Sequence, residues 1–200
     1  MYAPSHFREE RTEVLREAIS NIALATLVTH GEGQIEANHL PMLLEGDRLY
    51  GHFARANPVW QTLKPGADVL AIFLGAHFYT SPNWYPSKAV TGKGVPTWNY
   101  ISVQVRGTVT LHDDVEWLRA HVGALSHEHE KDRPTPWKVE DAPADYIAGL
   151  LRAIVGFEIS ITGMEGKWKL SQNRPAGDVA GIKHALIREG RDDLAGLLKE

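Results

Sequence analysis

Short apolar segments separated by polar turns fill residues 23–53, and this pattern limits the fold more than any other feature of the sequence. Residues 23–30, 34–44 and 49–53 carry the alternating or β-branched side chains that are typical of strands. The turns between them, Gly31-Glu32-Gly33 and residues 45–48, are too short for a crossover, and such turns join antiparallel neighbours. The pattern therefore predicts an antiparallel meander.

The rest of the chain mixes helices with further strands. Apolar residues at three- and four-residue steps predict helices over residues 8–22, 113–126, 144–153 and 179–198, the last broken near Gly190. A short helix capped by Asn57 is expected over residues 57–63, and strands are expected over residues 68–74, 101–111 and 154–162. Residues 75–99 are rich in aromatic residues, proline and glycine, which predicts a long loop of the functional kind.

Two hundred residues are enough for one domain with a well-buried core. The order of the expected strands and helices is too irregular for a doubly wound sheet, and the sequence has neither a GxGxxG nor a GxxxxGK(S/T) segment. The fold class we predict is mainly β with peripheral helices, a small β-barrel. We expect a single domain over residues 1–200, with its core at about 22–175 and a C-terminal helical segment at about 176–200.

Composition removes several classes of function. The chain has no cysteine, which excludes disulfides, thiolate metal sites, iron–sulfur clusters and cysteine nucleophiles. No apolar run approaches the ~20 residues of a membrane helix, and the first residues do not resemble a secretory signal, so we expect a cytoplasmic protein. The net charge of −4 argues against a broad nucleic-acid-binding face.

A first group of candidate residues lies on the expected hairpin and just after it. His39 and His52 fall on neighbouring strands, and Arg55 and Asn57 lie where a strand leads into a helix. An arginine beside backbone donors is a common way to bind phosphate. The alternative is that the histidines are ordinary sheet residues and that Arg55 pairs with a surface carboxylate. The spacing leaves both interpretations open.

A second and a third group follow in the second half of the chain. Trp98 and its aromatic neighbours could hold a planar heterocycle such as isoalloxazine, with Thr97, Asn99 and Lys88 at its polar edge. The alternative for this group is a hydrophobic cluster beneath a long loop. Residues 166–174, which include Gln172 and Arg174, suit either a cofactor-facing edge or an exposed turn.

Six longer motifs run through these groups. They are Met1-Tyr2-x-Pro4-x-His6-Phe7, His39-Leu40-Pro41, Gly51-His52-x-Ala54-Arg55-Ala56-Asn57-Pro58-x-Trp60, Tyr79-x-Ser81-Pro82-x-Trp84-Tyr85, Val95-Pro96-Thr97-Trp98-Asn99-Tyr100 and Lys169-Leu170-Ser171-Gln172-Asn173-Arg174. In these motifs the chain resembles the PaiB-type FMN-binding negative transcriptional regulators, over nearly its whole length. One departure is Phe78, where the family pattern has a small residue and where a bulky ring is expected to narrow the pocket.

The resemblance implies a split β-barrel of the pyridoxamine-phosphate-oxidase-like type, forming a homodimer with FMN at the subunit interface. It implies that Asn38, His39 and Leu40 line the flavin, that Arg55, Ala56 and Asn57 lie near its phosphate, that Thr97, Trp98 and Asn99 approach its ring, and that Gln172 and Arg174 of the partner subunit close the pocket.

The sequence leaves the function itself between alternatives. The first is a transcriptional regulator that binds FMN, and the second is an FMN-dependent oxidoreductase that acts on a small molecule with NAD(P)H as electron donor. Haem is a third ligand to consider, but the Arg55 and Thr97-Trp98-Asn99 motifs favour FMN. No helix-turn-helix pattern is recognisable. Acidic residues are mixed among the basic ones near the C-terminus, so the charge pattern does not support DNA binding either. His127 and His129 point apart on a helix, which argues against a metal site there.

Overall fold

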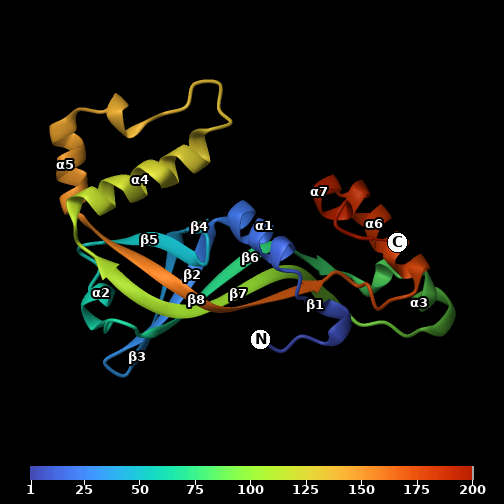
Figure 1. Ribbon diagram of the computed structural model, residues 1–200. Helices are drawn as coiled ribbons and strands as arrows, with labels where there is room; N and C mark the ends of the chain where they lie inside the picture. The colour runs from blue at the N-terminus through green and yellow to red at the C-terminus, as the bar shows by residue number, and fades with distance from the viewer. Residues whose placement is uncertain (200) are drawn as a thin grey trace. The chain divides into compact units, whose positions relative to one another are not determined.

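The computed structural model describes residues 1–199, and its strands form one mostly antiparallel sheet (Figure 1). The strands are β1 (Arg8–Glu9), β2 (Leu24–Gly31), β3 (Gln34–Pro41), β4 (Leu43–Glu45), β5 (Arg48–Ala54), β6 (Asp68–Thr80), β7 (Thr97–His112) and β8 (Ile154–Lys169). The helices are α1 (Thr12–Ile22), α2 (Val59–Thr62), α3 (Pro86–Thr91), α4 (Val115–Glu130), α5 (Ala144–Arg152), α6 (Ala176–Arg188) and α7 (Asp192–Ala195), with 3-10 turns η1 (Ser5–Phe7), η2 (Pro82–Trp84) and η3 (Val139–Asp141). The predicted class, mainly β with helices, is confirmed.

The order of the strands in the sheet is β3-β2-β6-β7-β8-β5-β4, with β1 paired to β8. The recorded pairings are antiparallel, as in Thr26 opposite His39 and His52 opposite Gly156. Strands β3 and β4 stand at the two ends of this order, so the sheet is not closed among residues 1–199. The expected barrel is therefore open in this structure.

The predicted meander over residues 23–53 is wrong in one respect. Strand β3 ends at Pro41, which lacks the N–H that would continue a ladder, and the next residue, Met42, is buried. The backbone N–H of Met42 donates to the carbonyl oxygen of Ala23 at 2.9 Å, and the chain then forms β4, which pairs with β5. A short turn joins β5 to β4, but on its other side β5 pairs with β8, which follows about 100 residues later in the chain.

The chain groups into two compact units. Unit 1 comprises Met1–Ala18, Leu74–Gln104 and Glu165–Glu200, and unit 2 comprises Ile19–Phe73 and Val105–Met164. Strands β6, β7 and β8 are long, with 13, 16 and 16 residues, and each of them has one part in unit 1 and the other part in unit 2.

The core of unit 2 is built on aromatic and branched side chains from its strands. The rings of Phe53 and Phe157 lie with their centroids 4.8 Å apart, and both are fully buried. Burying each ring stabilises the fold by roughly 1.5–3 kcal/mol. A Cβ added at Gly51 would lie 2.4 Å from the Phe157 ring, so the close approach requires glycine.

Helices α4 and α5 belong to unit 2 and share a small apolar cluster of Leu118, Val139, Ile147 and Leu151. Asp114 caps α4, because its Oδ1 accepts a hydrogen bond from the backbone N–H of Trp117 at 2.8 Å. The helix runs on to Glu130, so His127 and His129 lie in its last turn. None of the described helices is both long and apolar enough to cross a membrane.

The core of unit 1 joins the C-terminal helices to the segment around α3, and Figure 1 shows α6 beside α3, with α7 next to α6. Phe78, Tyr85, Val179, Ile182, Leu186 and Leu194 form this cluster. The predicted loop over residues 75–99 is therefore wrong as a loop, since β6 continues to Thr80 and η2 and α3 follow. Phe78 is 4 % exposed and packs within this core, which accounts for a bulky ring at its position.

Candidate functional site

The predicted residues on β3 lie in unit 2 and are partly open to solvent. His39 is exposed, and its Nδ1 shares a hydrogen bond with the hydroxyl of Thr26, its partner across the ladder, at 3.0 Å. Asn38 and Leu40 are half-buried on either side of it. His39 is thus a sheet residue with a satisfied ring nitrogen, and its contact with FMN stays a prediction.

Asn57 links β3 to the segment that follows β5. Its Nδ2 donates to Oδ1 of Asn38 at 2.6 Å, and its Oδ1 accepts from the backbone N–H of Val59 at 3.1 Å. The structure therefore brings together two of the predicted site residues. Helix α2 has only four residues, so its dipole adds little to phosphate binding at this point.

Arg55 follows β5, and acceptors surround its guanidinium. Its Nε donates to the carbonyl oxygen of Arg152 at 2.7 Å, and Nη2 donates to the carbonyl oxygen of Ile154 at 2.8 Å. Both terminal nitrogens pair with the carboxylate of Asp113. Hydrogen bonding to Asp113 raises the pKa of Arg55, and the same contact lowers the pKa of Asp113. A phosphate near Arg55 and the exposed Ala56 has to compete with Asp113, so this role stays a prediction.

The second set of predicted residues lies in unit 1, at the start of β7. The indole of Trp98 is 55 % exposed and stands edge-on to the ring of Tyr79, with centroids 6.0 Å apart. The ring of His77 lies 6.4 Å from it. Three exposed rings therefore lie together on the neighbouring strands β6 and β7, and their contact with the flavin ring stays a prediction.

Lys169 is close to this aromatic group, although the sequence alone did not single it out. Its Nζ donates to the carbonyl oxygen of Trp98 at 2.6 Å and to the hydroxyl of Thr97. Partial burial lowers the pKa of Lys169. The signal available in the sequence was the density of cations over residues 166–174.

Asn99 is fully buried, and its side-chain amide serves the interior of unit 1. Its Nδ2 donates to the hydroxyl of Thr80 at 2.9 Å, and its Oδ1 accepts from the hydroxyl of Ser171 at 3.1 Å. These bonds join β7 to the end of β6 and to the segment that follows β8. The structure shows that the Asn99 side chain holds these segments together. A direct contact of Asn99 with the flavin stays a prediction.

The remaining predicted residues also lie in unit 1. The side-chain amide of Gln172 is hydrogen-bonded to the backbone, because its Nε2 donates to the carbonyl oxygen of Trp168 at 2.5 Å. The guanidinium of Arg174 stacks over the ring of Tyr85 at 3.9 Å from its centroid. Nζ of Lys88 donates to Oδ1 of Asn83 at 2.6 Å. These contacts do not show whether Gln172, Arg174 and Lys88 bind FMN, so their roles stay predictions.

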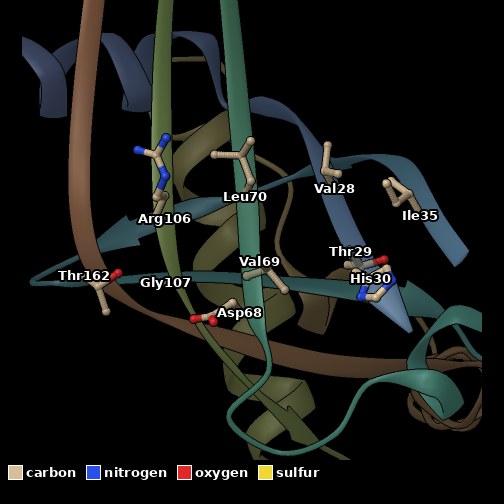
Figure 2. A pocket seen from close by; sticks show the side chains of 10 residues that line it. All are labelled: Val28, Thr29, His30, Ile35, Asp68, Val69, Leu70, Arg106, Gly107 and Thr162. Carbon is tan, nitrogen blue, oxygen red and sulfur yellow. The ribbon is translucent and has the colours of Figure 1, made fainter. Parts of the chain in front are cut away.

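A separate hollow of about 500 Å³ opens on the sheet of unit 2 (Figure 2). It contains a buried hydroxyl, Thr29 Oγ1, that has no hydrogen-bond partner among the described residues. Its lining consists of Val28, Thr29, His30, Ile35, Asp68, Val69, Leu70, Arg106, Gly107 and Thr162. None of the residues predicted from the sequence lines it.

The donor set of each unit can be compared with what FMN requires. The ring needs a flat surface with donors and acceptors at its edge, and the rings around Trp98 with the Thr97 hydroxyl supply them in unit 1. The phosphate needs cationic donors, and Arg55 in unit 2 and Arg174 in unit 1 are half-buried cations. The residues present therefore suit FMN in chemical type.

An exposed indole beside hydroxyl and ammonium groups on an antiparallel sheet is an arrangement that can receive a planar cofactor with a polar edge. Residues 1–163 match the family described as "Putative FMN-binding domain", and the chain belongs to this FMN-binding family. The resemblance to the PaiB-type proteins is thereby confirmed, and FMN is the cofactor that goes with it.

The comparisons with individual proteins agree with this family. The chain is 32 % identical over 193 residues to "Protease synthase and sporulation protein PAI 2" of Bacillus subtilis (strain 168), which covers 94 % of this chain and 90 % of that protein. Its structure is similar to the FAD and heme binding protein from Mycobacterium smegmatis, with a TM-score of 0.63, 17 % identity and coverage of 86 % and 78 %. It is also similar to the flavocytochrome Anf3 from Azotobacter vinelandii, with a TM-score of 0.57, 18 % identity and coverage of 87 % and 75 %. At these identities the two structures show a shared fold.

Proposed function

We propose that this chain is an FMN-dependent negative regulator of transcription that works as a cytoplasmic homodimer with FMN at the subunit interface. The observation that carries the FMN part is the exposed indole of Trp98 beside the rings of Tyr79 and His77. The regulatory part is supported by the similarity to the sporulation protein of Bacillus subtilis over 94 % of the chain.

In this proposal the predicted residues hold the cofactor. Asn38, His39 and Leu40 line the flavin from β3, and Arg55, Ala56 and Asn57 lie near the phosphate. Thr97, Trp98, Asn99 and Lys88 serve the ring, and Gln172 and Arg174 of the partner subunit close the pocket. The hydrogen bond between Asn57 and Asn38 supports a common role for β3 and the segment after β5.

A second candidate is an FMN-dependent oxidoreductase that takes electrons from NAD(P)H for a small substrate. Bound FMN would supply hydride or single-electron exchange, and the protein would orient it and exclude water. The net charge of −4 favours this candidate, because DNA binders usually present a positive surface to phosphates. The fold shared with a flavocytochrome is compatible with it.

Titration of the purified chain with FMN, followed by quenching of flavin fluorescence, tests the cofactor. Saturable binding at or below tens of micromolar is expected, in line with the cation-to-phosphate contacts that the proposal requires. Riboflavin is the matched ligand without phosphate, and we expect it to bind more weakly. Absence of saturable binding would end the proposal in both of its forms.

Two measurements on the FMN-loaded protein separate the regulator from the enzyme. The first is stopped-flow reduction of the bound flavin by NADH and NADPH, and the second is DNA binding as a function of salt concentration. A specific complex whose affinity falls steeply with salt, together with a flavin that NAD(P)H reduces slowly, supports the regulator. Rapid reduction with no DNA affinity supports the oxidoreductase instead.

A further inference from the structure

Lys169 ends β8 and lies within hydrogen-bond distance of two predicted flavin residues in the same unit. Its Nζ donates to the carbonyl oxygen of Trp98 at 2.6 Å and to the hydroxyl of Thr97. One bond therefore fixes the backbone that carries the exposed indole, and the other fixes a hydroxyl next to it.

The surroundings of Lys169 make these two bonds strong. The side chain is half-buried, and this partial burial lowers its pKa, while the nearby Tyr100 opposes the shift and the cations Lys167 and Arg174 add to it. An ammonium that is partly removed from water must replace its lost hydration with acceptors from the protein. Hydrogen bonds from a charged donor are about twice as strong as neutral ones.

The consequence concerns the direction in which Trp98 faces. In a strand, the orientation of the peptide determines the side of the sheet on which a side chain emerges. A carbonyl held by Lys169 therefore holds the indole of Trp98 in its exposed position beside Tyr79. The Asn99 amide, bonded to Thr80 and Ser171, anchors the next residue along β7.

We propose that Lys169 is a positioning residue for FMN binding, which holds Thr97 and Trp98 in the arrangement that receives the flavin ring. This proposal depends on the proposed FMN binding, and it gives a role to a residue that has none in the proposed function above. Lys169 acts through Thr97 and Trp98, so the phosphate of FMN is not its target.

The chain offers a matched control two residues earlier on β8. Nζ of Lys167 donates to the carbonyl oxygen of Tyr2 at 3.1 Å and lies 5.4 Å from the centre of the Tyr100 ring. It is a half-buried lysine of unit 1, like Lys169, and no recorded contact joins it to Thr97 or Trp98. Lys167→Met removes the same charge from the same strand as Lys169→Met.

The binding experiment measures FMN and riboflavin affinity for the three proteins. Lys169→Met is expected to weaken the binding of both ligands by roughly 10-fold, because Thr97 and Trp98 lose the two charge-assisted hydrogen bonds that position them. Lys167→Met is expected to change either affinity by less than about 3-fold, because exposed or half-exposed charges have small effects at a distance. Lys169→Arg, which keeps a charged donor, is expected to recover most of the loss.

A measurement without ligand separates this proposal from the proposed function. Trp98 is monitored by its indole N–H resonance, assigned with a Trp98→Phe variant, and by acrylamide quenching of its fluorescence. Lys169→Met is expected to shift that resonance and change the quenching, and Lys167→Met is expected to leave both close to those of the unmodified chain. If the chain binds no FMN and this pattern is still seen, the proposed function fails while the positioning of Trp98 stands.

Three outcomes would overturn the proposal. The first is a loss of FMN affinity with unchanged riboflavin affinity, which assigns Lys169 to the phosphate. The second is an equal loss in Lys167→Met, which makes the effect one of net charge. The third is an unchanged Trp98 resonance in Lys169→Met. Urea unfolding of each variant shows whether the chain is still folded, and a circular dichroism spectrum like that of the unmodified chain is required before affinities are compared.

Discussion

His52 on β5 and His121 on α4 share a hydrogen bond inside unit 2, with Nδ1 of His52 and Nε2 of His121 at 3.0 Å. Trp117 stacks on His121, with ring centroids 5.4 Å apart, and His121 is 6 % exposed. Burial lowers the pKa of His52, and burial together with the neighbouring His52 lowers the pKa of His121 to about 4. Both rings are therefore neutral at pH 7, which suits one donor and one acceptor in a shared bond.

This pair predicts that acid destabilises the protein in a defined range. The unfolded chain binds a proton at His121 near pH 6.5 and the folded chain only near pH 4, so the free energy of unfolding falls as the pH drops between these values. The loss from His121 alone is about 2 kcal/mol between pH 7 and pH 5. Urea unfolding as a function of pH measures it. His121→Gln keeps a hydrogen-bonding side chain without titration, and an identical pH slope in that variant would contradict the assignment.

The ion pair between Arg55 and Asp113 provides a test of whether Arg55 binds the phosphate of FMN. If Arg55 binds the phosphate, Arg55→Ala weakens FMN by roughly 10-fold and riboflavin much less, because only FMN loses a charge-assisted bond. Asp113→Asn removes the competing carboxylate and is expected to tighten FMN. Isothermal titration of both variants measures the two effects. Equal changes for FMN and riboflavin would place the phosphate elsewhere.

Among the elements, α6 shows how a helix is held in unit 1. Asp178, 2 % exposed, accepts hydrogen bonds from the backbone N–H of Ser87 at 3.0 Å and from its hydroxyl at 2.7 Å. The helix also approaches η2 closely, since a Cβ added at Gly181 would lie 2.1 Å from the carbonyl oxygen of Trp84. The sequence predicted this helix from its periodicity, but the docking against residues 84–87 depends on contacts distant in sequence.

Two glycines of α6 provide a matched pair for this docking. Gly181→Ala is expected to destabilise the protein by about 1–3 kcal/mol, because backbone must move to admit the methyl group. Gly177→Ala, which meets nothing within 4 Å, is expected to be neutral or to stabilise by up to about 1 kcal/mol through helix propensity. Thermal and urea unfolding measure both. A Gly181→Ala variant as stable as Gly177→Ala would mean that α6 is not packed tightly on this segment.

For the whole molecule, the proposed interface site links assembly to the cofactor. If two chains form the FMN pocket, the apparent FMN affinity rises with protein concentration, and FMN shifts the chain toward the dimer. Sedimentation velocity with and without FMN, at several protein concentrations, measures both effects. Saturable FMN binding by a monomer whose sedimentation does not change with concentration would contradict the shared site.

The sequence by itself determined the local features of this protein. Periodicity placed α4, α5 and α6 and the strands β2, β3 and β5 to within a few residues, because each depends on neighbours three, four or two positions away. Strands β6 and β8 end six and seven residues beyond their expected ends at residues 74 and 162. The motifs also identified the family, and with it FMN, since long runs such as residues 95–100 and 169–174 specify a site through side-chain identity.

Only the tertiary structure decided which partners these residues have. It paired β5 with β8, continued β6 through the predicted loop to Thr80, and buried Asn99 between Thr80 and Ser171. It also placed the ammonium of Lys169 against Trp98, 71 residues away in the chain. Such contacts form when distant segments bury apolar surface together, and a polar group enclosed there must take whichever acceptor lies nearest in space. The spacing of residues in the sequence therefore does not predict which acceptor a buried polar group will have.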